Sequence, residues 1–321
     1  MFDVKKMIEE IKSKKEIKNI SFTGVGGSLA CFYASYYYVS REAKGLTTSY
    51  TSANEFVHDT PACVGEHSIV VIASRGGNTA ETVEAGRVAK KLGATVIGLT
   101  HEEGDTGIKE VSDYTIVFED GEGVPFEIGK PAYILKIAYE TLNQVEGTGK
   151  YEAMVAAMSK MNSLIPAAKK AIIPEAIKFS INYKDDKIIY TMGSGTAWSA
   201  AQQQTICILM EMQWIHSSVI HTGEFFHGPF EITNPDTAFL LLKSTGKTKP
   251  LDERAISFLN DYNHHLTVID AEKYGMNDLG EVSEYFDYDF HTQMLDVFNH
   301  LLADMRNHPL SKRKYMWKYK Y

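Results

Sequence analysis

The sequence predicts an α/β protein with two doubly wound domains, each built on a parallel β-sheet. In residues 17–144, short runs rich in β-branched residues alternate with longer helical patterns, as in chains of βαβ units. The same order of strand, glycine turn and helix returns after residue 187, which indicates an internal duplication. A chain of 321 residues is long enough for two domains of ordinary size, each with its own core.

The first half contains regularly alternating elements. A strand over 17–23 leads through a glycine turn into a helix over 28–42. Further strands are predicted at 47–51, 67–73, 94–100 and 114–118, and further helices at 80–92, 106–111 and 130–144. Because helical crossovers cover both faces of a parallel sheet, we expect this sheet to be buried between two helical layers.

The second half repeats the pattern after helical material at 151–183. Its predicted elements are a strand at 187–192, a glycine turn at 193–195, a helix from 196 to about 212, and strands at 238–242 and 266–270. The boundary is predicted in the segment 146–149, which gives domains 1–150 and 151–321, although helix 151–171 fits either side.

The composition restricts the class of protein. Hydrophobic residues make up 44% and charged residues 23% of the chain, as in soluble globular proteins. The three cysteines form no CxxC pair, which suits a reducing cytosol. The charged N-terminal helix lacks the apolar core of a signal peptide, and apolar runs are too short for a membrane span. With a net charge of −8, we expect a cytoplasmic protein without membrane or nucleic-acid partners.

Residues 74–79 are a candidate phosphate-binding loop. They read Ser-Arg-Gly-Gly-Asn-Thr where a buried strand meets a helix. Gly76 lets the backbone turn its N–H groups inward, the hydroxyls of Ser74 and Thr79 can donate hydrogen bonds, and Arg75 adds charge. The helix N-terminus also favours an anion. The simpler alternative is a helix cap with a tight turn, since serine, threonine and asparagine favour such positions.

A second glycine turn lies at residues 24–28, after the first strand. Gly27 and Ser28 would therefore lie at the same carboxyl edge of the sheet as the loop 74–79, where ligands bind in open α/β folds. A dinucleotide-binding interpretation is weak, because Leu29 occupies the third glycine position of GxGxxG and no acidic residue ends the second strand. We therefore expect no nicotinamide cofactor.

These loops resemble those of the sugar isomerase (SIS) family. The family pattern Ser-x-Ser-Gly-x-Thr is matched by residues 74–79, except that Gly76 replaces the middle serine. Ser28 matches the serine of the first turn that contacts phosphate, and Glu127 begins a Glu-Ile-Gly segment that the family places beside the sugar. The resemblance covers nearly the whole chain and implies two tandem SIS domains of the flavodoxin-like type.

The stretches 210–216 and 223–229 most resemble fructosamine-6-phosphate deglycases and the isomerase half of glucosamine-6-phosphate synthases. The resemblance implies that Glu211 moves a proton between C1 and C2 and that His227 opens the sugar ring. It also implies a homodimer or higher homo-oligomer in which the histidine serves the neighbouring subunit's site. The chemistry fits, because a buried glutamate suits proton transfer at carbon and histidine exchanges protons near neutral pH. Taken alone, the residues also fit a solvated helix face and a loop histidine.

Two further sequence patterns allow other interpretations. His216, His221 and His227, with Glu211, invite a zinc interpretation, but their spacings of five and six do not share a helical face, so no metal is expected. The tail 311–321 mixes basic and aromatic residues, a pattern of single-stranded nucleic-acid binding. In the SIS family the tail instead packs over the sugar site, which is the interpretation we favour, with no residue roles assigned.

The function implied by the resemblance is cleavage of a 6-phosphorylated Amadori compound, such as fructoselysine 6-phosphate. The products would be glucose 6-phosphate and a free amino acid, formed through an enolamine without metal or redox cofactor. Two alternatives stay open. One keeps the Glu211–His227 pair and makes the chain an aldose–ketose isomerase or deaminase of a sugar phosphate or aminosugar phosphate. The other is a sensor of sugar phosphates, which would not need the pair.

Overall fold

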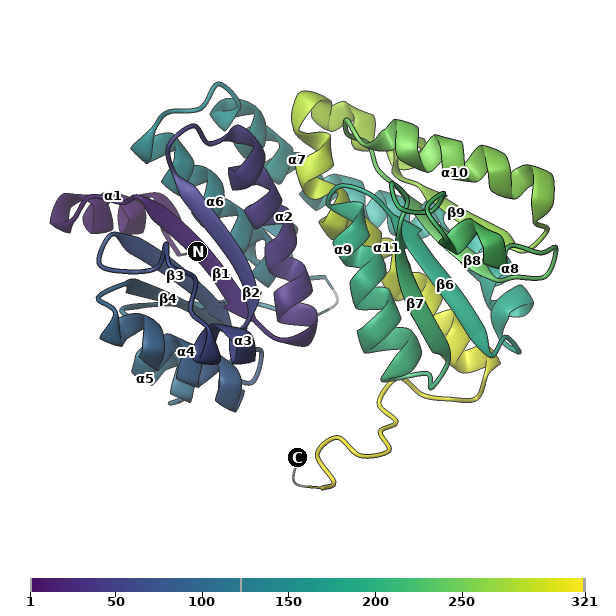
Figure 1. Cartoon of the computed structure of the whole chain (residues 1–321), viewed down its shortest axis with the longest axis horizontal. Helices are drawn as coiled ribbons and strands as arrows, with labels where there is room; N and C mark the ends of the chain where they lie inside the picture. Colours follow the sequence, from purple (N-terminus) through teal and green to yellow (C-terminus); the bar gives the residue numbers. More distant parts are fainter. Residues whose placement is uncertain (1, 122, 320–321) are drawn as a thin grey trace. The chain divides into compact units, whose positions relative to one another are not determined.

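The computed structural model describes residues 2–121 and 123–319, which form two compact units (Figure 1). Unit 1 ends at Asn162 and unit 2 begins at Ser163. This division lies inside helix α7 (Tyr151–Ala171), whereas the sequence places the boundary after residue 150. Each unit has its own parallel sheet, so the predicted α/β class with two doubly wound sheets is confirmed.

The sheet of unit 1 has the strand order β2-β1-β3-β4-β5, with all neighbours parallel. Its strands are β1 (Asn19–Gly24), β2 (Thr47–Ser52), β3 (Ser68–Ala73), β4 (Thr95–Thr100) and β5 (Tyr114–Val117). Every residue of β1 and β3 is buried, because helices cover both faces of the sheet. In this order the connections reverse direction between β1 and β3, which is the switch point where ligands bind.

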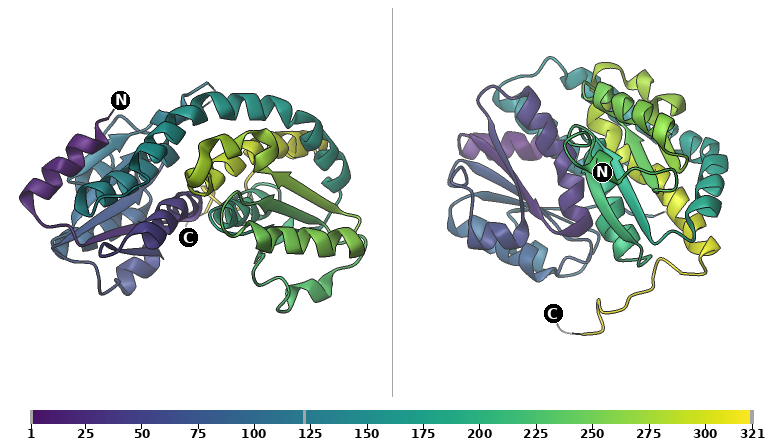
Figure 2. Two further views of the ribbon diagram at one scale, coloured as in Figure 1. Left: turned by 90° about the horizontal axis from the view of Figure 1, so that it is seen from above. Right: turned by 45° about the vertical axis from the view of Figure 1, so that its right-hand side comes forward.

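Helices cover unit 1 in two groups that contact one another within each group, and Figure 2 shows both layers. The first group is α1 (Val4–Lys14), α2 (Gly26–Glu42) and α6 (Lys130–Val145), preceded by the 3-10 turn η1 (Phe126–Ile128). The second group is α3 (Ala53–His58), α4 (Ala80–Lys91) and α5 (Gly107–Val111).

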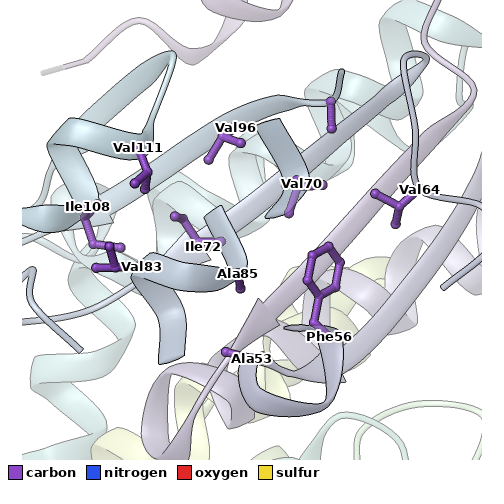
Figure 3. Close-up of a cluster of buried hydrophobic side chains, with 12 residues drawn as sticks. Ala53, Phe56, Val64, Val70, Ile72, Val83, Ala85, Val96, Ile108 and Val111 are labelled. Atoms are coloured by element: carbon purple, nitrogen blue, oxygen red, sulfur yellow. The ribbon is translucent and has the colours of Figure 1, made fainter. Parts of the chain in front are cut away.

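Apolar side chains fill the space between the sheet and the second group (Figure 3). Ile72 of β3 and Val96 of β4 face Val83 of α4 and Ile108 of α5 in one buried cluster. β-Branched residues pack well on a pleated surface, which explains why these runs form strands. The packing fixes α4 against β3 and thereby fixes the loop that joins them.

The sheet of unit 2 has the order β7-β6-β8-β9, again with all neighbours parallel. Its strands are β6 (Ile188–Gly193), β7 (His216–His221), β8 (Phe239–Lys243) and β9 (Leu266–Asp270). The helices are α8 (Ile173–Tyr183), α9 (Ala197–Gln203), the π-helix η2 (Gln204–Met210), α10 (Lys249–Tyr262) and α11 (Asp287–Met305). The 3-10 segments are η3 (Pro229–Ile232), η4 (Ala271–Tyr274) and η5 (Met276–Phe286). None of the described helices combines the length and apolar character that a membrane crossing needs.

Unit 2 departs from the sequence prediction in two places. The helix predicted from 196 to about 212 is present, but it is α-helical only to Gln203 and continues as a π-helix to Met210. Strand β7 was not predicted, because its sequence His-Ser-Ser-Val-Ile-His is polar. As an edge strand, β7 is only partly buried, so it lacks the continuous apolar run that reveals central parallel strands.

Candidate active site

The loop at residues 74–79 closes on itself through hydroxyl and backbone hydrogen bonds. The Oγ of buried Ser74 lies 2.8 Å from Oγ1 of Thr79, and the N–H of Thr79 donates to the same Oγ over 3.4 Å. The N–H of Gly77 donates to the carbonyl of Ser74 over 3.0 Å. When Thr79 donates its hydroxyl to Ser74, the hydroxyl hydrogen of Ser74 stays free for a ligand.

The two glycines of this loop have different roles. Gly77 has a φ of +71°, and an added Cβ would lie 2.6 Å from the side chain of Thr106, so a larger residue does not fit. A Cβ at Gly76 would meet no atom within 4 Å among the described residues. Gly77 therefore shapes the turn, whereas Gly76 leaves open space at the position where the family pattern has serine.

Helix α4 begins directly after the loop with its first amides available. Thr79 is the N-cap residue, yet its side chain makes no capping hydrogen bond. The first N–H groups of a helix have no partner within the helix, and they attract anions together with the helix dipole. The loop and the helix end together form a seat suited to a phosphate.

The charge near this seat comes from a residue that the sequence analysis did not single out. The Nε of Arg75 is held by the carboxylate of Asp120 over 2.7 Å, on the surface, so its charge is already paired. Lys130, at the start of α6, instead donates from Nζ to Oγ of Ser28 over 3.3 Å. Lys130 directly follows the Glu-Ile-Gly segment, and that position was the only signal in the sequence.

The first glycine turn begins α2 beside the seat. Gly26 has a φ of +54°, and Gly27 and Ser28 lie in the first turn of the helix. In the register of the adjacent strands, Thr23 of β1 pairs with Ile72 of β3. The two glycine turns thus leave neighbouring strands at the switch point, where α2 and α4 go to different faces of the sheet.

Glu127 lies in η1, near the carboxyl edge of the sheet of unit 1. Its N–H donates to Oδ1 of Asn162 over 3.3 Å, and its carbonyl accepts a hydrogen bond from Nζ of Lys136 over 2.9 Å. Burial lowers the pKa of Lys136, and the nearby carboxylate of Glu127 partly opposes this shift. The backbone of Glu127 is therefore held firmly on both sides.

Unit 2 has the corresponding switch point between β6 and β8, but its polar groups are satisfied internally. Asp287 accepts hydrogen bonds from the N–H of Thr245 over 2.8 Å and the hydroxyl of Ser244 over 3.0 Å. Asp252 accepts from the N–H of Ser244 over 2.8 Å. Both carboxyl groups are fully buried, and Ser194 in the second glycine turn bonds to Thr248 over 2.9 Å. Carboxyl groups of the chain itself thus fill the loop of unit 2 that corresponds to the loop 74–79 of unit 1.

Glu211 directly follows the π-helix of unit 2. Its N–H donates to the carbonyl of Ile206 over 3.2 Å, which continues the wide π-helical turn. Such turns recur at functional sites because they redirect a side chain. The carboxylate is 24% exposed and lies 2.9 Å from Nη2 of Arg313 in the C-terminal tail. Burial raises the pKa of Glu211, and the charge of Arg313 partly opposes the rise.

The carboxylate of Glu211 lies in a cavity of about 390 Å³. One wall is formed by the chain around the end of the π-helix and the start of β7, and the other by the tail. The lining residues are Met210, Glu211, Trp214, Ile215, His216, Arg313, Lys314, Tyr315 and Met316. The tail thus contributes to the surroundings of a predicted catalytic residue within unit 2.

His227 does not lie beside Glu211 within the chain. It is exposed in the turn after β7, where its N–H donates to the carbonyl of Glu224 over 2.9 Å. Glu211 precedes β7, and six residues of strand span roughly 17–20 Å. The two predicted catalytic residues therefore lie at opposite ends of one strand. His216 and His221 begin and end the same strand, and no three metal-ligating side chains cluster within residues 2–121 and 123–319.

A loop suited to an anion at the switch point of a doubly wound sheet is typical of α/β proteins that bind phosphorylated ligands. The comparisons with known proteins agree. A model of the SIS domain matches residues 15–128. Fructosamine deglycase FrlB of Bacillus subtilis is 36% identical over 320 residues, 99% of this chain and 97% of that protein. Fructoselysine 6-phosphate deglycase of Escherichia coli is 25% identical over 82% of this chain and 76% of that protein.

Solved structures show the same relationship. One described as a phosphosugar isomerase from Salmonella typhimurium has a TM-score of 0.96 and 46% identity, covering 99% of this chain and 96% of that chain. The C-terminal domain of a glucosamine-fructose-6-phosphate aminotransferase from Francisella tularensis shares the fold, with a TM-score of 0.75, 16% identity, and coverage of 95% and 88%. The chain belongs to the SIS family, among its enzymes. The predicted family is thereby confirmed.

Proposed function

We propose that this chain is a deglycase that cleaves fructosamine 6-phosphates, such as fructoselysine 6-phosphate, into glucose 6-phosphate and a free amino acid. The proposal depends chiefly on Glu211, whose carboxylate is partly buried in a cavity in a position suited to proton transfer. Similarity over nearly the whole chain to fructosamine deglycase FrlB supports it. The position of Glu211 supports the proposal more strongly than any other observation on the chain.

The substrate's phosphate would be held by unit 1. We assign this role to the hydroxyls of Ser74 and Thr79, the first amides of α4, and the pair formed by Ser28 and Lys130. Hydrogen bonds to an ionised phosphate are stronger than those between neutral groups. Binding energy from this end of the substrate can hold C1 and C2 in place for the reaction.

Glu211 would carry out the proton transfer at carbon. It takes a proton from C1, and the electron pair of that C–H bond forms the C1=C2 double bond of an enolamine while the C2 oxygen gains a proton. A proton returned at C2 then leaves a double bond between C1 and nitrogen. Water adds to this imine at C1, and the amine departs. Because burial raises the pKa of Glu211, the carboxylate can both accept and return a proton nearer neutral pH.

His227 would open the sugar ring of the substrate bound by a second copy of the chain. Glu211 and His227 lie at opposite ends of β7, so one chain does not bring them together there. A two-fold arrangement can present the His227 turn of one subunit to the Glu211 cavity of the other. We therefore propose a homodimer, or a higher oligomer built from it, with a shared active site.

Subunit mixing tests the shared site. Glu211→Gln and His227→Asn proteins are each expected to be nearly inactive, because every site lacks one residue. In mixed dimers one site has both substitutions and the other has neither, so an equal mixture should regain roughly a quarter of the wild-type activity. Each variant mixed with itself is the control. Absence of recovery, with subunit exchange shown by mass spectrometry, would contradict the shared site.

Product analysis tests the deglycase activity. The protein is incubated with fructosamine 6-phosphates that carry different amino acids, and glucose 6-phosphate is measured with a coupled dehydrogenase assay. We expect equal amounts of glucose 6-phosphate and free amino acid, and no reaction with the unphosphorylated compounds. Formation of neither product from any of these compounds would refute the proposal. Conversion of simple ketose phosphates alone would favour an isomerase.

A further inference from the structure

The cavity beside Glu211 holds more positive than negative charge. Glu211 is its acidic lining residue, whereas Arg313 and Lys314 are both cationic. Most of the remaining wall is apolar or aromatic, with Met210, Trp214, Ile215, Tyr315 and Met316. One carboxylate thus faces two cations in a space of about 390 Å³. The arrangement suits a ligand that carries a negative charge and an apolar part.

Arg313 is buried yet keeps an unused donor. The residue is 9% exposed, and its Nη1 donates to the carbonyls of Leu310 over 2.7 Å and Lys312 over 2.9 Å. Its Nη2 pairs with Glu211. The Nε has no hydrogen-bond partner among the residues that the structure describes. A buried guanidinium normally uses its donors, so this N–H keeps unused hydrogen-bonding capacity. The guanidinium also lies 5.2 Å from the ring centre of Trp317.

Lys314 is the second cation of the cavity and lies at its exposed side. Its Nζ is 5.3 Å from the ring centre of Tyr315, and no carboxylate within residues 2–121 and 123–319 forms an ion pair with it. An ammonium on a flexible stem can move toward an anion. Lys314 therefore offers a charge that Glu211 does not neutralise.

We propose that this cavity binds the amino-acid part of the substrate and that Arg313 and Lys314 bind its carboxylate. The inference rests on the proposed function, because the amine leaves from C1, the carbon on which Glu211 acts. Groups next to Glu211 are thus next to the amine, whereas the phosphate is on C6, at the other end of the sugar. Trp214, Tyr315 and Met210 provide apolar surface for the rest of the amino acid.

The two cations are needed because the site already contains an anion. A carboxylate that approaches Glu211 meets a like charge, which weakens binding and raises the pKa of both groups. Arg313 neutralises Glu211, and Lys314 supplies the charge for the incoming carboxylate. An amine without a carboxylate gains nothing from Lys314. The cavity should therefore select amino acids over simple amines.

Two matched substrates test this selection. The 6-phosphates of fructosylglycine and fructosylethylamine differ in that a carboxylate replaces a methyl group. With wild-type protein we expect kcat/KM to be about tenfold higher or more for the glycine compound, as for loss of a hydrogen bond to a charged group. Lys314→Met should lower kcat/KM for the glycine compound about tenfold and leave the ethylamine compound within about twofold.

The control is a neighbouring lysine that is not among the lining residues. Lys312 stacks over the ring of Trp214 at 5.0 Å, and Lys312→Met should change the ratio between the two substrates by less than about twofold. Arg313→Lys should lower kcat for both substrates, because Arg313 also holds Glu211. Lys314 is therefore the position that reports on the carboxylate alone.

Failure of this inference is distinguishable from failure of the proposed function. The subsite is refuted if wild-type protein has equal kcat/KM for the two substrates, or if Lys314→Met lowers kcat/KM equally for both. Either result would still show deglycase activity. If neither compound yields glucose 6-phosphate, the proposed function fails, and calorimetric binding of the two compounds then decides the subsite: equal affinities overturn it. Weaker binding of glucose 6-phosphate itself to Lys314→Met would show that the cavity holds phosphate instead.

Discussion

The two units share a doubly wound sheet, yet their switch points differ in what occupies them. In unit 1, the loop at residues 74–79 presents hydroxyls and an uncapped helix end to a ligand. In unit 2, the corresponding loop surrounds the carboxyl groups of Asp252 and Asp287, which are fully buried. The chain's own carboxyl groups therefore accept the hydrogen bonds that a phosphate would accept.

The two units share a fold but differ at this position. In unit 1 the loop groups are open to an anion, whereas in unit 2 the chain's own carboxyl groups fill the corresponding loop. We therefore propose that the two units have separate tasks. The predicted proton-transfer residue of unit 2, Glu211, lies at the other edge of its sheet, before β7. Variants that affect binding in one unit and stability in the other can test this division.

The largest expected contrast concerns the hydroxyls of the seat in unit 1. A Ser74→Ala, Thr79→Ala double variant should weaken binding of glucose 6-phosphate by roughly a hundredfold or more, since each hydrogen bond to a charged group contributes about 1.5–3 kcal/mol. The free energy of unfolding should fall by about 1–2 kcal/mol, because the variant also removes the hydrogen bond between the two hydroxyls and the acceptor of the Thr79 N–H. Isothermal calorimetry measures the affinity, and urea denaturation measures the stability.

The matched control lies in unit 2. Ser244→Ala removes a hydroxyl that donates to Asp287 over 3.0 Å, so it should lower the free energy of unfolding by about 1–3 kcal/mol and leave glucose 6-phosphate binding unchanged. If Ser244→Ala loses as much affinity for glucose 6-phosphate as the double variant does, the assignment of phosphate binding to unit 1 alone is contradicted.

The pH dependence of stability provides a further test of the difference between the two units. Burial raises the pKa of Asp252 to about 6 and that of Asp287 to about 8. Unfolded aspartate has a pKa near 3.9, so the folded protein binds more protons above that value. The free energy of unfolding should therefore fall as the pH rises, between about 4 and 6 because of Asp252 and between about 4 and 8 because of Asp287, by at most about 1.4 kcal/mol per pH unit for each group.

Asp287→Asn should flatten this dependence, because the amide does not titrate. Urea denaturation at pH 5 and pH 8 measures the slope, and the Ser74→Ala, Thr79→Ala protein serves as the control with an unchanged slope. If Asp287→Asn keeps the wild-type slope of the free energy of unfolding against pH, the carboxyl group of Asp287 does not cause the pH dependence.

The smallest expected effects concern the two glycines of the seat. Gly77→Ala should lower the free energy of unfolding by about 1–3 kcal/mol, because of its φ of +71° and the close side chain of Thr106. Gly76→Ala should stay within about 0.5 kcal/mol of wild type, since its Cβ meets open space. Thermal unfolding measures both, and equal losses would show that the loop is not held as described.

The sequence predicted the central strands of both sheets well, since β3, β4 and β8 are runs of β-branched and other apolar residues. It missed β7, because an exposed edge strand needs no apolar run. It also missed the π-helix before Glu211, since helical propensity does not distinguish a π-turn from an α-turn. Local pattern thus predicts buried elements better than exposed or irregular ones.

The candidate site was predictable where its residues are adjacent in sequence. Ser74 and Thr79 belong to one short loop, and the structure brings their hydroxyls together. The pairing of Arg313 with Glu211 joins residues about a hundred positions apart, so no local spacing could reveal it. The role of Asp287 in unit 2 was hidden for the same reason, because it begins a helix far from the loop that it fills.

The division of tasks between the units is tested most directly by Glu211→Gln, measured for both turnover and binding. We predict that kcat for a fructosamine 6-phosphate falls about 10²–10⁴-fold, as for loss of a general base, while the affinity for glucose 6-phosphate stays within about threefold. An unchanged kcat, or a loss of glucose 6-phosphate affinity as large as the loss of kcat, would contradict it.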